Sequence, residues 1–259
     1  MKETKFKFLY IVFFCIVCLI GYSFADQGDT SKEKYAWGFG RGKDHSQAVL
    51  DSKPIKALDK YNGIAMGNKE SNKIYLTFDC GYEAGYTEEI LSILKKTNVK
   101  ATFFITAHYL NTAEDIVKKM IEQGHEVGNH TVNHKDITSL SDNELKSEIM
   151  NLHTAMVEKT GYEMKYFRPP KGEFSDYTLG FLKNLGYTTV LWSNAYDDWN
   201  TDNQGRAEYG KKKLLDNLHS GCVILLHSTS RDNKDLLENF INEAIKMGYE
   251  FDTLENFER

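Results

Sequence analysis

Five groups of polar residues in this chain have residue types and spacings suited to acid–base or metal chemistry. Each group lies at the end of, or shortly after, a short run of apolar or β-branched residues. A carboxylate can act as a general base, an imidazole can donate a proton or bind a metal, and a guanidinium can hold a carboxylate ionised. In chain order the groups are Thr77-Phe78-Asp79-Cys80-Gly81, Gly128-Asn129-His130 with His134 four residues later, Arg168-Pro169-Pro170-Lys171-Gly172, Asp197-Asp198-Trp199, and Leu225-Leu226-His227-Ser228.

Each group taken alone also has a structural explanation. Asp79 shortly before a glycine could form a turn, Arg168 could pair with any surface carboxylate, and His227 after an apolar run could be a hydrogen-bonded core histidine. A lone His-x-x-x-His outside a helix is a weak indication of a metal. Their shared position at the ends of predicted strands favours a functional explanation.

The elements that must position these groups alternate between strand and helix. Amphipathic helices are predicted over 88–97, after the capping box Ser141-x-x-Glu144, and over about 234–247. Such alternation predicts an α/β fold with parallel strands, either a barrel smaller than the eight-unit kind or an open doubly wound sheet. The predicted strands are 74–79, 101–106, 126–130, 166–168, 188–193, 223–228 and 250–252.

Functional residues of parallel barrels gather at the carboxyl ends of several strands, as these groups do. The ordered motifs T-F-D-x-G, H-x-x-x-H, R-P-P-x-G, D-W and L-L-H over about 73–257 resemble carbohydrate esterase family 4, the polysaccharide deacetylases. The resemblance implies a distorted (β/α)7 barrel and hydrolysis of an amide bond. The run from Thr77 to Tyr86 is similar to the subfamily of N-acetylmuramic acid deacetylases, which prepare muramic δ-lactam in spore cortex peptidoglycan.

The resemblance also implies roles for single residues. Asp79 is the general base, Arg168 keeps it ionised and oriented, and the backbone N–H of Lys171 stabilises the oxyanion. His227 protonates the leaving amine.

The implied metal is divalent, with zinc as the expected ion and harder ions left open. His130 and His134 are its expected ligands. In the wider family a second Asp follows the base and binds the metal, whereas here that residue is Cys80. A thiolate suits zinc, so a Cys-His-His site is predicted; the alternative is a neutral thiol that binds nothing, with Asp79 or water in its place.

The substrate is expected to contact residues around the same rim. Leu226 and Trp199 are predicted to pack around the acetyl methyl group, and Lys171 to meet the lactyl carboxylate of muramic acid. Tyr82 and Glu83, with Tyr86, are predicted to line the cleft, or else to pack at a helix N-terminus.

A second departure from the family pattern concerns the charge partner of His227. The expected Asp three residues before Asp198 is replaced by Ala195. The sequence therefore predicts either that Asp197 substitutes for it or that His227 works with a lower pKa.

The N-terminus has the pattern of a targeting segment. Lys2, Lys5 and Lys7 precede an uncharged run over 8–20 and a small-x-small ending, so 1–25 is predicted to be a signal peptide or, if uncleaved, a membrane anchor. The chain of 259 residues has a formal charge of −5, and 1–25 carries +2, which leaves −7 on the remainder. This segment predicts a secreted or membrane-anchored location outside the cytoplasm, and the resemblance implies the cell wall or the forespore intermembrane space.

The rest of the chain divides into an extension over 26–72, wrapped on the main domain by Trp37 and Phe39, and a barrel over 73–259. Cys80 and Cys222 are predicted to stay unpaired, because Cys80 lies at the rim beside Asp79 whereas Cys222 lies five residues before His227, about 16 Å down its strand. The expected partners are peptidoglycan glycan strands; the acidic charge argues against nucleic acid, and a monomer is expected. Two alternatives remain: a deacetylase of another glycan (N-acetylglucosamine in peptidoglycan, chitin-type oligosaccharides or acetylxylan), and a non-catalytic glycan-binding module.

Overall fold

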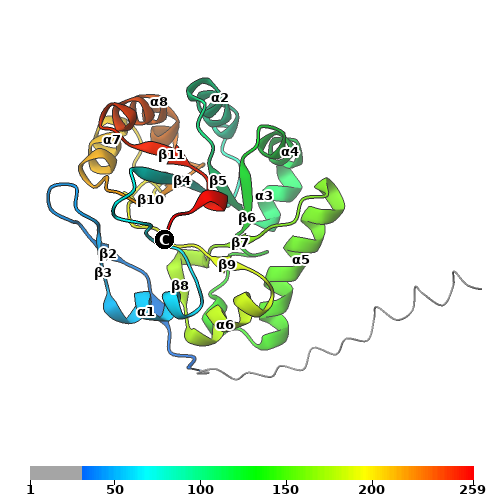
Figure 1. Ribbon diagram of the computed structural model, residues 1–259. Coiled ribbons are helices and arrows are strands. Elements are labelled where there is room, and N and C mark those ends of the chain that lie inside the picture. The colour runs from blue at the N-terminus through cyan, green and yellow to red at the C-terminus, as the bar shows by residue number, and fades with distance from the viewer. Residues whose placement is uncertain (1–30) are drawn as a thin grey trace, which may run out of the picture. The chain divides into compact units, whose positions relative to one another are not determined.

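One curled parallel sheet forms the centre of the computed structural model, which describes residues 31–259 (Figure 1). Its seven strands follow the order β10-β4-β5-β6-β7-β9, with β11 paired to the start of β4, and every pair in it is parallel. The predicted α/β fold with seven strands is confirmed. The strands are β4 (Lys73–Cys80), β5 (Thr102–Ile105), β6 (Glu126–Asn129), β7 (Tyr166–Phe167), β9 (Thr188–Thr189), β10 (Val223–His227) and β11 (Glu250–Asp252).

The sheet curls until its edges approach each other, which gives a half-barrel. Only the first two residues of the predicted strand 188–193 form β9. The segment that follows then crosses to β10, where the backbone N–H groups of Ser193 and Asn194 both donate to the carbonyl oxygen of Val223. Irregular hydrogen bonding across this gap replaces a regular strand pair, which explains the distortion of the barrel.

Helices cover the outer face of the sheet (Figure 1). All three helices predicted above are present: α2 spans Thr87–Thr97, α5 spans Asp142–Thr160, and α8 spans Arg231–Lys246. The capping box of Ser141 and Glu144 is formed at the start of α5. The remaining helices of this layer are α3 (Ala107–Thr112), α4 (Glu114–Glu122), α6 (Asp176–Asn184) and α7 (Ala207–Asp216), with short 3-10 turns at Ile137–Ser139, Pro170–Gly172 and Leu254–Asn256.

Side chains alternate between the two faces of each strand, and the two faces build separate apolar clusters. Phe78, Cys80 and Leu226 belong to the large cluster between sheet and helices. Tyr75 and Phe104 belong to a smaller cluster inside the curl of the sheet. Asp79 shares the inner face of β4 with Tyr75 and lies toward the carboxyl end of the strand, so the candidate site lies at the carboxyl end of this inner cluster.

The described part of the predicted extension, 31–72, packs on the edge of the domain near α6. Its elements are β1 (Tyr35–Ala36), β2 (Phe39–Gly40), β3 (Val49–Leu50) and a helix not predicted from sequence, α1 (Ser52–Lys60). β1 pairs with β8 (Glu173–Phe174), and the indole N–H of Trp37 donates to the carbonyl oxygen of Trp192.

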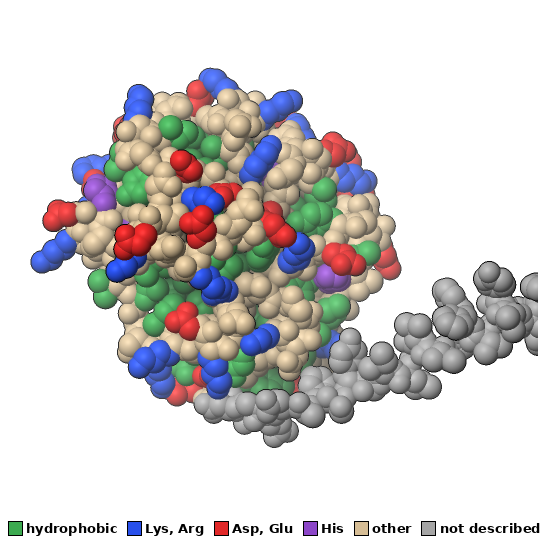
Figure 2. Space-filling model, viewed as in Figure 1, with side chains coloured by type: hydrophobic (Ala, Val, Ile, Leu, Met, Phe, Trp, Pro, Cys, Tyr) green, Lys and Arg blue, Asp and Glu red, His purple; other side chains and the backbone are tan. Residues whose placement is uncertain are grey.

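The predicted signal or anchor over 1–25 lies outside the described residues. Within 31–259, no helix is both long and apolar enough to span a membrane. On the face shown in Figure 2, acidic and basic side chains are interspersed. Cys80 and Cys222 are buried and free, as predicted.

Candidate active site

A buried ion pair forms the base of the site. Asp79 lies near the carboxyl end of β4, with its side chain on the inner face of the sheet. Arg168 follows β7 and is fully buried, and its guanidinium Nη1 donates to Oδ1 of Asp79 at 2.8 Å. The ring of Phe104 lies 4.2 Å beneath that guanidinium. Burial alone would raise the pKa of Asp79, but the charge of Arg168, together with that of His227 and the hydrogen bond from Arg168, outweighs it and lowers the pKa. Asp79 is therefore ionised at neutral pH and oriented by one fixed contact.

His130 follows β6 and faces the same carboxylate. Its Nδ1 lies 2.8 Å from the carbonyl oxygen of Arg168, which can only accept, so Nδ1 carries the proton. Burial lowers the pKa of His130 to about 4, which leaves the imidazole neutral at neutral pH. Its Nε2 lone pair then lies 3.5 Å from Oδ2 of Asp79. Two acceptors facing each other in a buried site favour a cation or a proton between them.

His134 lies beside His130, with ring centroids 4.8 Å apart. The loop that carries it has left-handed backbone at Thr131 and at His134 (φ 70° and 55°), and the N–H of His134 donates to Oγ1 of Thr131. Buried Glu148 of α5 accepts from both the backbone N–H and the side-chain amide of Asn133. Burial lowers the pKa of His134 as well, so both imidazoles are neutral.

The Cys80 thiol does not complete a metal site. Cys80 follows Asp79 on the same strand, so its side chain points to the opposite face and packs fully buried in the outer cluster. Burial raises its pKa far above neutral, so the group is a protonated thiol. The prediction of a Cys-His-His site is wrong for this reason, and across 31–259 no three His, Cys, Asp or Glu side chains converge as a ligand group. The neutral imidazoles of His130 and His134 are still suited to a divalent metal.

The partner of His227 is Asp198, which neither prediction above selected. Nδ1 of His227 donates to Oδ1 of Asp198 at 2.9 Å, and the backbone N–H of His227 donates to Oδ2 at 2.6 Å. Asp197 instead forms an ion pair with Arg206. Burial disfavours charge on His227, yet Asp198 outweighs it and raises the pKa, so the predicted lower pKa is also wrong. The useful sequence signal was the position of Asp198 directly before Trp199.

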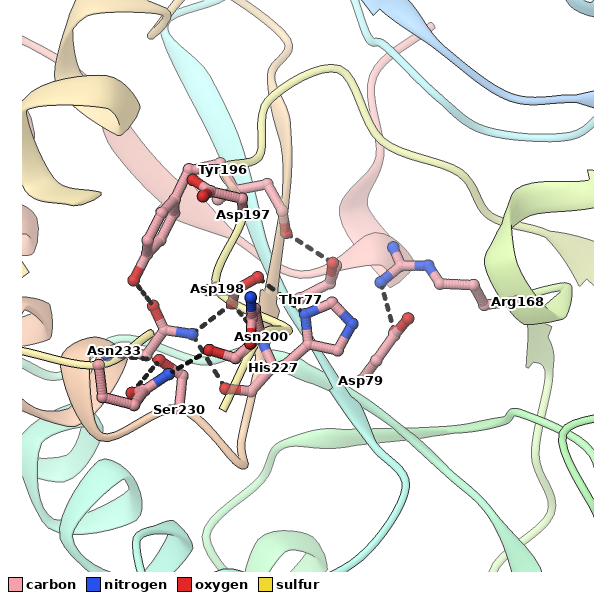
Figure 3. A network of polar contacts seen from close by, with 12 residues as sticks. Thr77, Asp79, Arg168, Tyr196, Asp197, Asp198, Asn200, His227, Ser230 and Asn233 are labelled. Carbon is pink, nitrogen blue, oxygen red and sulfur yellow. Dashed lines mark hydrogen bonds and ion pairs between the residues drawn. The ribbon is translucent and has the colours of Figure 1, made fainter. Parts of the chain in front are cut away.

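Figure 3 shows how these pairs lie together. The imidazole of His227 lies between Asp198 on one side and the Asp79–Arg168 pair on the other. The register of β10 against β4 places His227 directly beside Asp79. An ionised carboxylate and an imidazole with a raised pKa are thus held on adjacent strands at one end of the sheet, an arrangement suited to general base and general acid work.

Two of the predicted substrate contacts are used elsewhere in the fold. Leu226 pairs with Phe78 and faces the helices, so it cannot line an acetyl pocket; Leu225 is the leucine on the inner face. Glu83 packs at the N-terminus of a helix, which was the alternative to lining the cleft. Its carboxylate accepts from the backbone N–H of Gly85 and from the hydroxyls of Thr87 and Tyr109, which fixes the start of α2.

Three other predicted contacts remain available at the surface. The Tyr82 and Trp199 side chains are 46% and 65% exposed, so Trp199 is open to solvent rather than packed over a pocket. Lys171 is exposed, has a left-handed backbone (φ 57°), and its charge adds to burial in lowering the pKa of His134. The backbone N–H of Trp37 donates to the carbonyl oxygen of Gly172, which holds the loop of Lys171 in place.

Comparison with known proteins agrees with this geometry. The polysaccharide deacetylase family profile matches residues 66–190. Peptidoglycan-N-acetylmuramic acid deacetylase PdaA of Bacillus subtilis (strain 168) is 35% identical over 243 residues, which are 93% of this chain and 92% of that protein. The chain belongs to the polysaccharide deacetylase family.

Two solved structures of family 4 carbohydrate esterases extend the agreement to the fold. That of Bacillus subtilis PdaA has a TM-score of 0.85 and 36% identity, and covers 88% of this chain and 97% of that chain. A family 4 carbohydrate esterase from Bacillus anthracis has a TM-score of 0.75 and 35% identity over 89% of this chain and 98% of that chain. Polysaccharide deacetylases of this family are metal-dependent amide hydrolases, which confirms the predicted family and enzyme class.

Proposed function

We propose that this protein removes the acetyl group from N-acetylmuramic acid residues of peptidoglycan glycan strands, outside the cytoplasm. The observation that carries the reaction is the pairing of ionised Asp79 with protonated His227 on adjacent strands. The choice of sugar is supported by similarity to PdaA along nearly the whole chain. Deacetylation frees an amine on the sugar that also bears the lactyl carboxylate, so the product is the precursor of muramic δ-lactam in spore cortex.

In the proposed mechanism, Asp79 and His227 transfer protons and the backbone of Lys171 stabilises the oxyanion. Asp79 accepts a proton from the attacking water as the C–O bond to the acetyl carbon forms. His227 donates its proton to the sugar nitrogen as the C–N bond breaks, which releases acetate and the amine. The backbone N–H of Lys171 faces the oxyanion. A divalent metal, with zinc proposed, would be held by His130 and His134 and would acidify the water and polarise the acetyl carbonyl.

Exposed side chains around this centre would bind the glycan. Tyr82 and Trp199 offer aromatic faces to sugar rings. The exposed Lys171 ammonium would meet the lactyl carboxylate of muramic acid, which glucosamine lacks. A Lys171→Ala variant is therefore expected to lose preference between the two sugars.

Acetate release by the purified protein tests the proposal. Glycan strands freed of peptide are the expected substrate, and intact peptidoglycan, chitin-type oligosaccharides and acetylxylan are compared at equal acetyl content. Asp79→Asn and His227→Ala should each abolish release, and chelation should lower it until zinc is restored. Faster release from chitin-type oligosaccharides or acetylxylan would replace the substrate assignment. Glycan binding without any acetate release would indicate a binding module.

A further inference from the structure

A buried chain of hydrogen bonds continues beyond Asp198 to two residues that have no role in the mechanism above. The side-chain amide of Asn233 donates from Nδ2 to Oδ2 of Asp198 and to the carbonyl oxygen of His227, and the hydroxyl of Tyr196 donates to its Oδ1 at 2.6 Å (Figure 3). We propose that Asn233, oriented by Tyr196, is a positioning residue that fixes the Asp198 carboxylate against the imidazole of His227.

The chemistry of the donors and acceptors allows only one orientation of this amide. Asp198 can only accept when ionised, so Nδ2 of Asn233 must face it, and Oδ1 must then face Tyr196. Burial raises the pKa of Tyr196 well above its usual value, so its hydroxyl remains a donor at any working pH. Asn233 is fully buried, and both its nitrogen and its oxygen are engaged. No water is needed to satisfy the group, and the amide has no freedom to flip.

Asn233 supplies the one hydrogen bond to the Asp198 carboxylate that does not come from His227. Oδ1 of Asp198 accepts from the imidazole of His227, and Oδ2 accepts from the backbone N–H of His227 and from Asn233. Without Asn233, both remaining donors would belong to His227 itself, and nothing outside that residue would fix the carboxylate. Asn233 thus links the pair formed by Asp198 and His227 to a separate element of the fold.

That element is the first turn of α8. Ser230 caps the helix by accepting from the backbone N–H of Asn233. The loop that carries Asp198 is tied to the same turn, because the N–H of Gly205 donates to Asp232 and the hydroxyl of Ser230 donates to Gln204. These other contacts hold the loop as a whole, whereas Asn233 alone among them reaches the catalytic carboxylate.

The inference rests on the proposed function only where activity is measured, since the imidazole of His227 can be titrated without substrate. The charged groups that act on it are Asp198 and Asp79, which raise its pKa, and Arg168, which lowers it; the imidazole of His134 also interacts with it. A change at Asn233 leaves all of these groups in the chain. A fall in the His227 pKa would therefore report weaker contact with Asp198.

Two variants test the proposal in the full protein: Asn233→Leu, which keeps the volume but removes both polar atoms, and Tyr196→Phe, which removes only the hydroxyl. In Asn233→Leu, kcat for acetate release should fall by about 10- to 100-fold with KM within about twofold, because misplacement of a catalytic group acts on the chemical step. NMR of labelled histidine should show a lower titration midpoint for His227. Tyr196→Phe should show smaller changes in the same direction, which keeps the test available if Asn233→Leu does not fold.

Matched controls separate positioning from general damage. Asn194 is equally buried and lies beside Ile224 near the start of β10. Its side-chain amide donates to the carbonyl oxygen of Leu214. Asn194→Leu, and Tyr75→Phe on β4, should leave the His227 midpoint unchanged whatever they do to melting temperature. An unchanged or raised midpoint in both Asn233→Leu and Tyr196→Phe would overturn the inference, as would an equal fall in Asn194→Leu. Absence of acetate release by the wild type would instead count against the proposed function.

Discussion

Replacing Asp198 by Asn should remove most of the proposed general acid activity. Asp198 is 2% exposed, and its carboxylate accepts three hydrogen bonds, two from His227 and one from Asn233. An asparagine offers one oxygen, so its NH2 group must face at least one of these donors. The substitution also removes the negative charge that holds the pKa of His227 above its ordinary value.

The size of the effect follows from these contacts. A buried donor left without an acceptor costs about 1–3 kcal/mol, which a domain with about 5–15 kcal/mol of stability survives. A positioned general acid contributes about 10²- to 10⁴-fold to rate, so kcat should fall within that range. KM should change little, because Asp198 is buried behind His227.

The assay is acetate release from glycan strands as a function of pH. The protonated form of His227 is the active one, and a raised pKa keeps it protonated to higher pH. In Asp198→Asn the pKa falls, so the basic limb of the kcat profile should move to lower pH. The control is Asp197→Asn, whose side chain is 48% exposed and paired with Arg206; its kcat should stay within about twofold of wild type. Wild-type kcat and pH profile in Asp198→Asn would refute the assignment, and equal losses in both variants would trace the effect to the loop.

Two further predictions concern stability. Burial lowers the pKa of His125 from 6.5 to about 4, so the unfolded state binds more protons between these two pH values and the free energy of unfolding should fall by about 3 kcal/mol as pH drops from 6.5 to 4. His125→Asn should reduce this pH dependence of the melting temperature, whereas His108→Asn, at an exposed position, should not. Equal slopes of melting temperature against pH in the wild type and both variants would contradict the reasoning. Trp37→Ala should lower the free energy of unfolding in urea by about 3–5 kcal/mol, and should lower kcat, because Trp37 packs on the loop of Gly172. An unchanged urea midpoint would show that the extension over 31–72 does not stabilise the domain.

The elements of the fold were predictable because their signals are local. The capping box of Ser141 and Glu144 satisfies backbone donors within one turn, and it forms where the sequence placed it. The seven predicted runs are short and rich in β-branched and aromatic residues, and each corresponds to one strand of the sheet. The shortening of 188–193 was not predictable, because it depends on hydrogen bonds from Ser193 and Asn194 to a strand some 30 residues later.

The site was predictable where one motif supplies both the residue and its orientation. Asp79, His130, Arg168 and His227 lie at or directly after the carboxyl ends of strands whose direction the fold class already fixes. The role of Asn233 had no such signal, since it lies on a helix turn and meets Asp198 across 35 residues. Its importance depends on the path of the irregular loop before α7, which no periodicity describes.

The wrong assignments of Cys80 and Leu226 have one physical cause. Neighbouring residues of a strand face opposite sides, and β4 and β10 pair so that His227 lies beside Asp79 at a spacing of about 4.8 Å. Once Asp79 and His227 face inward, the residues next to them on these strands must face the helices. The same alternation makes Leu225 the leucine that shares the inner face with Asp79 and His227. It also turns Cys80 away from the proposed metal, so that His130 and His134 are the side chains that would hold it and further coordination positions would be open for water and substrate, as catalytic metal sites require.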